Sequence, residues 1–202
     1  MNLKTPFMLA ILALAMSLVA ASVFTYYPIT LAVQPTGMKV VFDLGSNANQ
    51  PDVSGNIQVS VGQNNTSVQI IIHPTYQVTY YKNITLIKNT DMKGYNVYLV
   101  VDDFSKSLPA NSKVVLYVYN LGAARNLQGW SASNLAPVSG YVRSIDLSSP
   151  TSDQVIHIGT LNSGGVWEID ILVYIPEGTT IDGASATFNM YLVASPSSET
   201  PP

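Results

Sequence analysis

The chain of 202 residues contains no cysteine, and only 10% of its residues are charged. Without cysteine it has neither a disulfide framework nor a thiolate nucleophile or metal ligand. Its nine Lys and Arg residues are scattered and its formal net charge is −3, so no surface for nucleic acid is expected. A hydrophobic fraction of 47% is nevertheless sufficient to form the core of a single domain.

Residues suited to catalysis or metal binding are also scarce. There are only two histidines, and each falls at an expected strand position: His73 precedes Pro74, and His157 lies in the stretch VIHIG. No HExxH or GxSxG motif occurs, so we expect no enzyme activity, no catalytic or metal-binding residues and no cofactor. Asp91 and the pair Asp102-Asp103, expected near turns, leave a weak calcium site open, although their spacing matches no known calcium loop.

One expected strand carries two carboxylates. Glu168 and Asp170 in WEIDILV share a strand face and lie about 7 Å apart by strand geometry, so they could face a sugar or a cation. The alternative is that they form the solvated face of an amphipathic strand. Alternation with Trp167, Ile169 and Ile171 favours this second interpretation.

The N-terminus has the features of a signal peptide. Lys4 precedes an apolar run of about 13 residues, and the small residues Ala20, Ala21 and Ser22 follow it. We therefore predict a signal peptide over residues 1–22, cleaved after Ala21 or Ser22, and a secreted, extracellular or cell-surface protein that meets the membrane only transiently. The run is shorter than the roughly 20 residues that span a bilayer, and an uncleaved anchor is the alternative.

Residues 22–33, SVFTYYPITLAV, follow this leader and form an aromatic, β-branched strand pattern. Pro28 lacks an N–H and divides the stretch into an arm, residues 22–27, and a strand that begins at Ile29. We expect residues 23–34 to form a donor arm and first strand that pair with the sheet of another subunit. The predicted interface residues are Val23, Phe24, Thr25, Tyr26, Tyr27, Pro28, Ile29 and Leu31.

The rest of the chain reads as alternating strands bounded by Gly, Pro, Ser, Asn and Asp. Residues 62–65 form an expected hairpin turn, the strand over 76–88 is long enough to bend near Lys82-Asn83, and residues 120–139 are left unassigned. About ten strands predict an all-β, antiparallel jelly roll or β-sandwich over residues 35–194, with a flexible tail over 195–202. The strands are expected at 38–44, 57–61, 67–73, 76–88, 95–102, 113–119, 140–147, 155–161, 166–175 and 184–194.

Three sequons, at Asn64, Asn65 and Asn83, are candidate N-glycosylation sites in a secreted chain. Trp130, Trp167 and the twelve tyrosines could stack on sugar rings. Packing in the core or in cross-strand pairs is the favoured role for these aromatic residues.

Three segments carry a family resemblance: ASVFT at 21–25, ITLIKNTDMKGYNVYLVV at 84–101 and VYIPEGTTIDGASATFNMYLVA at 173–194. In their order and placement the chain resembles the TasA/camelysin family of secreted biofilm-matrix fibre proteins, most closely the bundling pili of hyperthermophilic archaea. This resemblance implies a jelly-roll subunit that polymerises by donor-strand complementation. Its partners would be copies of itself, with lateral bundling left open.

Two functional hypotheses follow. The first is a structural subunit of an extracellular filament, whose N-terminal strand inserts into a groove of the next subunit by β-augmentation. Such an interface joins two different surfaces, so repetition gives an open filament. The alternative is a secreted β-sandwich that binds carbohydrate through aromatic or carboxylate side chains.

Overall fold

The computed structural model describes residues 37–126, 139–151 and 153–199, with Gln128, Ser131 and a few isolated positions before residue 37. The chain divides into two units, Met1–Thr36 and Gly37–Pro202, and all twelve strands described belong to the second. None of the described residues forms a helix long and apolar enough to cross a bilayer. Most of the predicted signal peptide and residues 22–30 of the donor arm lie outside the described residues, whereas Leu31 is described.

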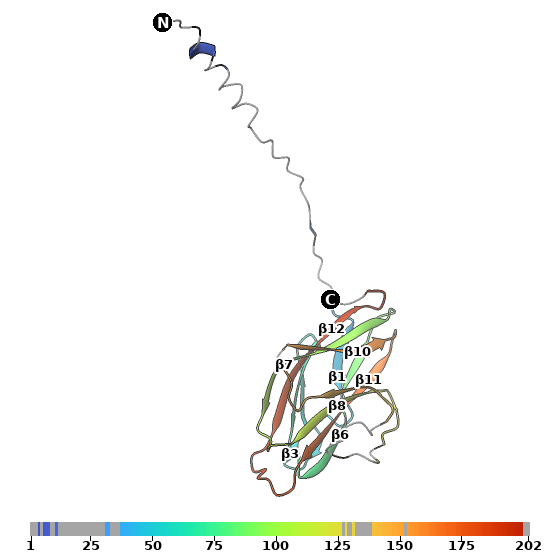
Figure 1. Cartoon of the computed structure of the whole chain (residues 1–202). Coiled ribbons are helices and arrows are strands. Elements are labelled where there is room, and N and C mark those ends of the chain that lie inside the picture. Colours follow the sequence, from blue (N-terminus) through green and yellow to red (C-terminus); the bar gives the residue numbers. More distant parts are fainter. Residues whose placement is uncertain are drawn as a thin grey trace. The chain divides into compact units, whose positions relative to one another are not determined.

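Two five-stranded antiparallel sheets pack face to face (Figure 1). The first sheet has the order β1 (Val40–Leu44), β6 (Gln77–Asn89), β11 (Val166–Ile175), β8 (Lys113–Asn120) and β9 (Tyr141–Asp146). The second has the order β10 (Gln154–Leu161), β7 (Tyr95–Lys106), β12 (Ala186–Pro196), β5 (Ser67–Ile72) and β4 (Gln58–Val61). A short hairpin of β2 (Pro51–Asp52) and β3 (Gly55–Asn56) joins β1 to β4. The predicted all-β antiparallel sandwich of about ten strands is confirmed.

The connections follow the jelly-roll pattern. From β5 to β12 the chain changes sheet at every connection except the one from β8 to β9. The resulting four-stranded layers, β5-β12-β7-β10 and β6-β11-β8-β9, are those of an eight-stranded jelly roll. β4 adds a fifth strand beside β5 in the second sheet, and β1 adds a fifth strand beside β6 in the first sheet. The four edge strands of the sandwich are therefore β1, β4, β9 and β10.

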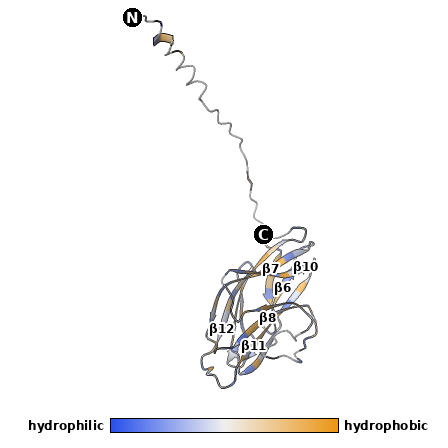
Figure 2. Ribbon diagram, in the orientation of Figure 1, coloured by the Kyte–Doolittle hydropathy of each residue, from blue (hydrophilic) through white to orange (hydrophobic). Residues whose placement is uncertain are grey.

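The core lies between the sheets and follows from strand alternation. In β8, Val114, Leu116 and Val118 point into it, while Phe188 enters from β12 of the opposite sheet. Hydrophobic and hydrophilic residues accordingly alternate along several strands (Figure 2). Trp167 is also part of this core, which confirms a packing role for that residue.

Most strand limits fall within a few residues of the prediction, and three differences have local causes. The β2–β3 hairpin occupies a segment predicted as loop. Asp102 and Asp103 were predicted near a turn, and this prediction is wrong. Both lie inside β7, which continues to Lys106 through a β-bulge. The predicted tail also begins too early, because β12 continues to Pro196 and the Ser197 N–H donates to the Gly94 carbonyl.

The expected bend in the strand over 76–88 is confirmed as a bulge in β6. In the pairing with β11, the partner of Ile169 is Thr85 and that of Ile171 is Tyr81, so three residues of β6 oppose Asp170 alone. Asn83, at the centre of the bulge, has a positive φ of 46°. Asparagine tolerates this left-handed conformation better than most residues.

Candidate functional site

One side of the sandwich, between edge strands β1 and β4, is closed by main-chain and side-chain hydrogen bonds. The Phe42 N–H of β1 donates to the carbonyl of Asn65 in the β4–β5 hairpin at 2.7 Å. On β4, the Val59 N–H donates to Asn49 Oδ1 at 3.1 Å, and the adjacent Ile57 exchanges bonds with Asn49 and Gln50. Each of these two edges is therefore partly engaged by hydrogen bonds within the subunit.

The opposite side of the sandwich, formed by the edge strands β9 and β10, differs in its main-chain hydrogen bonding. Within residues 38–126, 139–151 and 153–199, no residue outside the sheets makes a main-chain hydrogen bond to β9 or to residues 155–160 of β10. An edge strand with free N–H and C=O groups is a template for another chain. The described part of the sandwich is thus asymmetric, with one hydrogen-bonded side and one side whose edges have pairing capacity left.

Of these two edges, β10 is the more receptive to a strand. β9 carries the charged residues Arg143 and Asp146, which are of the kind that protect edges from pairing. β10 has eight residues and no Asp, Glu, Lys or Arg. Its Val155 side chain is 62% exposed. A neutral, partly apolar edge of this length is the strongest candidate for strand addition within the described sandwich.

The predicted donor residues can be placed only in part. Val23, Phe24, Thr25, Tyr26, Tyr27, Pro28 and Ile29 lie outside the described residues. Leu31 is described, belongs to the unit Met1–Thr36, and is 83% exposed.

The outer face of the first sheet holds a buried charge cluster. Glu168 and Asp170 of β11 were expected on a solvated face, and this interpretation is wrong, because Asp170 is fully buried and Glu168 nearly so. The guanidinium of Arg125 donates from Nε to Asp170 Oδ2 at 2.8 Å and from Nη2 to Glu168 Oε2 at 2.5 Å. The Tyr80 hydroxyl also donates to Asp170 Oδ2 at 2.5 Å. Their alternation with the core residues of β11 was predicted correctly, but their surroundings were not.

The electrostatics of this cluster suit a structural role. Burial alone would lower the pKa of Arg125, but its hydrogen bonds with Asp170 and Glu168 outweigh burial and raise that pKa. Burial, followed by the bond to Asp170, raises the pKa of Tyr80. Arg125 thus remains charged and Tyr80 neutral over the physiological pH range. The cluster fixes the segment after β8 onto the sheet.

Sequence reasoning missed Arg125, which lies in the segment left unassigned. The strand itself carried a signal for such a cation. Its sequence, VWEIDILVYI, is apolar except for two carboxylates, and if both faces of the strand are buried these carboxylates need a cationic partner. Nothing local in the sequence shows that the outer face is covered.

Several of the tyrosines pack as predicted. Tyr117, Tyr119 and Tyr141 form a ring cluster beside this charge cluster, and the Tyr117 and Tyr141 centroids are 5.4 Å apart. The guanidinium of Arg125 lies 4.3 Å from the centroid of Tyr119. Tyr117 and Tyr119 are fully buried, so these two rings offer no surface to a sugar, and Trp130 lies outside the described residues.

The two histidines and Asp91 have separate structural partners. His157 stacks on Tyr98 with centroids 4.8 Å apart, and the His73 N–H donates to Asp52 Oδ2 at 2.9 Å. Asp91 accepts a hydrogen bond from the Tyr95 hydroxyl at 2.5 Å. Within residues 37–126, 139–151 and 153–199, no group of three or more His, Asp or Glu residues is placed to hold a metal ion.

The sequons fall in two different environments. Asn64 and Asn65 are exposed in the β4–β5 hairpin turn. Asn83 is partly buried, and its side-chain Nδ2, the atom to which an N-glycan would be attached, donates to Glu168 Oε1 at 3.1 Å. The hairpin sites are thus accessible for glycosylation, whereas Asn83 participates in the charge cluster.

Comparison with known proteins adds no assignment: no protein-family model matches the chain, and no curated protein matches it in sequence.

Proposed function

We propose that this chain is the structural subunit of an extracellular filament, in which the N-terminal strand of one subunit pairs with the β10 edge of another. The observation that carries the proposal is the asymmetry of the sandwich. The β1 and β4 edges are partly engaged by hydrogen bonds within the subunit, whereas β10 carries no charged residue and its outer edge makes no main-chain hydrogen bond to residues outside the sheets within 38–126, 139–151 and 153–199.

The donor and acceptor are matched in length and chemistry. Residues 22–31 span about 33 Å when extended, and the eight residues of β10 span about 27 Å. Burial of a large apolar side chain contributes roughly 1.5–3 kcal/mol, and the arm carries Phe24, Ile29 and Leu31 among others. Main-chain hydrogen bonds add to this contribution.

The geometry of such a contact favours polymerisation. The donor leaves one surface of the subunit and the acceptor edge is a different surface, so the interface is heterologous and does not have to close. We further propose that the protein is secreted and that removal of residues 1–22 frees the arm. The hairpin sequons would carry any glycans on the outside of the sandwich.

Electron microscopy of the purified mature protein, denatured and then refolded, tests the proposal. The mature chain is expected to form filaments, and a version without residues 22–27 is expected to remain a folded monomer, as judged by circular dichroism. Filaments from the shortened version would contradict the donor role of the arm.

A second pair of variants tests the acceptor edge. Val155→Lys places a charge on β10, whereas Val193→Lys places one on β12, away from the edge, at a side chain that is also exposed. We expect Val155→Lys to abolish or strongly slow filament growth and Val193→Lys to permit it. Equal growth of both variants would exclude β10 as the acceptor.

A further inference from the structure

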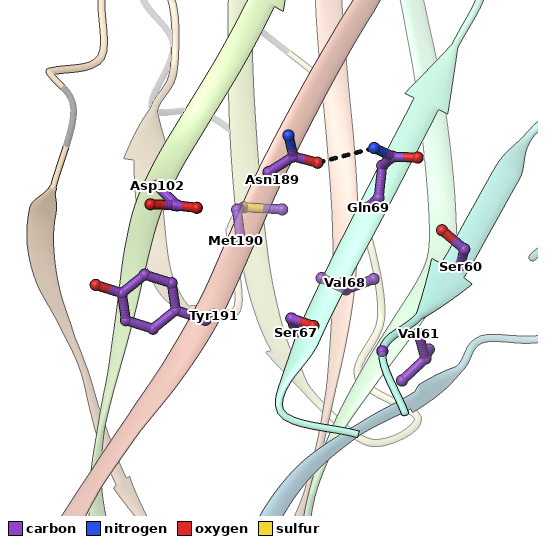
Figure 3. Close-up of a pocket in the computed structure, with 10 residues that line it drawn as sticks. Ser60, Val61, Ser67, Val68, Gln69, Asp102, Asn189, Met190 and Tyr191 are labelled. Carbon is purple, nitrogen blue, oxygen red and sulfur yellow. Dashed lines mark hydrogen bonds between the residues drawn. The ribbon is translucent and has the colours of Figure 1, made fainter. Parts of the chain in front are cut away.

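A polar hollow of about 350 Å³ lies on the outer face of the second sheet (Figure 3). It crosses four strands, β4, β5, β12 and β7. Six polar side chains line it: Ser60, Ser67, Gln69, Asp102, Asn189 and Tyr191.

The hollow results from small residues on one side and a bulge on the other. Ser60, Gly62 and Ser67 border it and leave space that larger side chains would fill. On β7, the pairing with β12 shifts between Asn189 and Met190, so that Asp102 is the extra residue of a bulge. Bulges redirect side chains, and Asp102 here lies in the same hollow as Tyr191.

The polar groups retain hydrogen-bonding capacity. Gln69 Nε2 donates to Asn189 Oδ1 at 3.0 Å, which orients both amides and leaves Asn189 Nδ2 as a donor. Among the described residues, none makes a hydrogen bond or salt bridge to the Asp102 carboxylate, so its oxygens remain available as acceptors. The hollow therefore places a strong acceptor, an amide donor, two serine hydroxyls and an aromatic ring together (Figure 3).

This combination selects a class of ligand. No Lys or Arg lines the hollow, which disfavours phosphates and other anions, and a single carboxylate supplies too few oxygens for Ca²⁺. Neutral sugar hydroxyls can donate to a carboxylate while accepting from an amide N–H, and a sugar ring has an apolar face that fits against tyrosine. We propose that this hollow is a binding site for a neutral saccharide.

Two sources could supply such a saccharide. The β4–β5 hairpin that borders the hollow also carries Asn64 and Asn65, so a glycan on this hairpin of another copy is one source. A neutral polysaccharide outside the protein is the other. This proposal is argued from residues on the outer face of the sandwich and does not depend on the proposal that the N-terminal arm is a donor strand.

The test uses the mature chain without glycans and measures binding of a panel of neutral oligosaccharides by calorimetry and NMR. An acidic, uronic-acid oligosaccharide and a neutral peptide serve as comparison ligands. Asp102→Asn and Tyr191→Leu are expected to weaken binding of the best neutral sugar by about tenfold or more. The matched control is Asp103→Asn, which alters the neighbouring carboxylate of the same strand outside the hollow, and it should remain within about twofold of wild type.

Three results would overturn the proposal: no neutral sugar bound at millimolar concentration, equal effects of Asp102→Asn and Asp103→Asn, or binding of the peptide alone.

The source of the saccharide is tested by comparing the glycosylated protein with the variant Asn64→Gln/Asn65→Gly. Glycine suits the positive φ of 56° at position 65. If copies of the glycosylated protein associate, free sugar disrupts the association and the variant does not associate, the glycan is the source. If the glycosylated protein does not associate and both proteins bind external oligosaccharide, the polysaccharide is the source.

Discussion

Replacement of Arg125 by methionine tests whether the charge cluster on the first sheet holds the fold together. Arg125→Met keeps much of the apolar stem and removes the guanidinium that donates to both Asp170 and Glu168. Asp170 would still accept from the Asn83 N–H at 2.8 Å and from Tyr80. Two carboxylates would then share a buried site without a cation.

The expected cost follows from this burial. Removing one partner from a buried ion pair costs about 3–5 kcal/mol, because the remaining charge is uncompensated. Neutralising the carboxylates should restore part of the loss. In the triple variant Arg125→Met/Glu168→Gln/Asp170→Asn, the asparagine oxygen can still accept from Asn83, so we expect at least about 2 kcal/mol to be regained.

Urea unfolding of monomeric protein provides the assay, with wild type, Arg125→Met and the triple variant compared under the same conditions. A loss below about 1 kcal/mol in Arg125→Met, or no recovery in the triple variant, would refute the view that Arg125 compensates two buried charges.

Three further predictions concern the bulge, the tyrosines and the sequons. Gly45→Ala would place its Cβ 2.1 Å from the Asn83 carbonyl oxygen and should lower the free energy of unfolding in urea by about 3 kcal/mol. A loss near zero would mean that the bulge of β6 can shift to accommodate the methyl group. Burial raises the pKa values of Tyr80 and Tyr81, so the unfolded chain loses their protons first and stability should fall above about pH 10 by up to about 1.4 kcal/mol per pH unit for each tyrosine. An alkaline loss of stability that is the same in Tyr80→Phe/Tyr81→Phe as in wild type would contradict this. Mass spectrometry of secreted protein should find glycan at Asn64 or its neighbour and none at Asn83, whose Nδ2 bonds to the charge cluster, and a fully occupied Asn83 would count against that bond.

The sequence by itself determined the strands, because alternation and turn residues are local signals. The strand predicted over 166–175 coincides with β11, and the expected bend at Lys82-Asn83 is the bulge of β6. Both predictions needed only the side chains of one segment and its neighbours. The all-β class follows from the number of such segments.

Only the tertiary structure decided which faces and edges are covered. Glu168 and Asp170 look solvated in their own strand, yet Arg125, more than forty residues away in sequence, pairs with both of them. Asn65 similarly closes the β1 edge through Phe42, which is distant in the chain, while β10 keeps its edge. Such contacts join residues far apart in sequence, so no local pattern records them, and they decide which carboxylates are neutralised and which edge remains available to another chain.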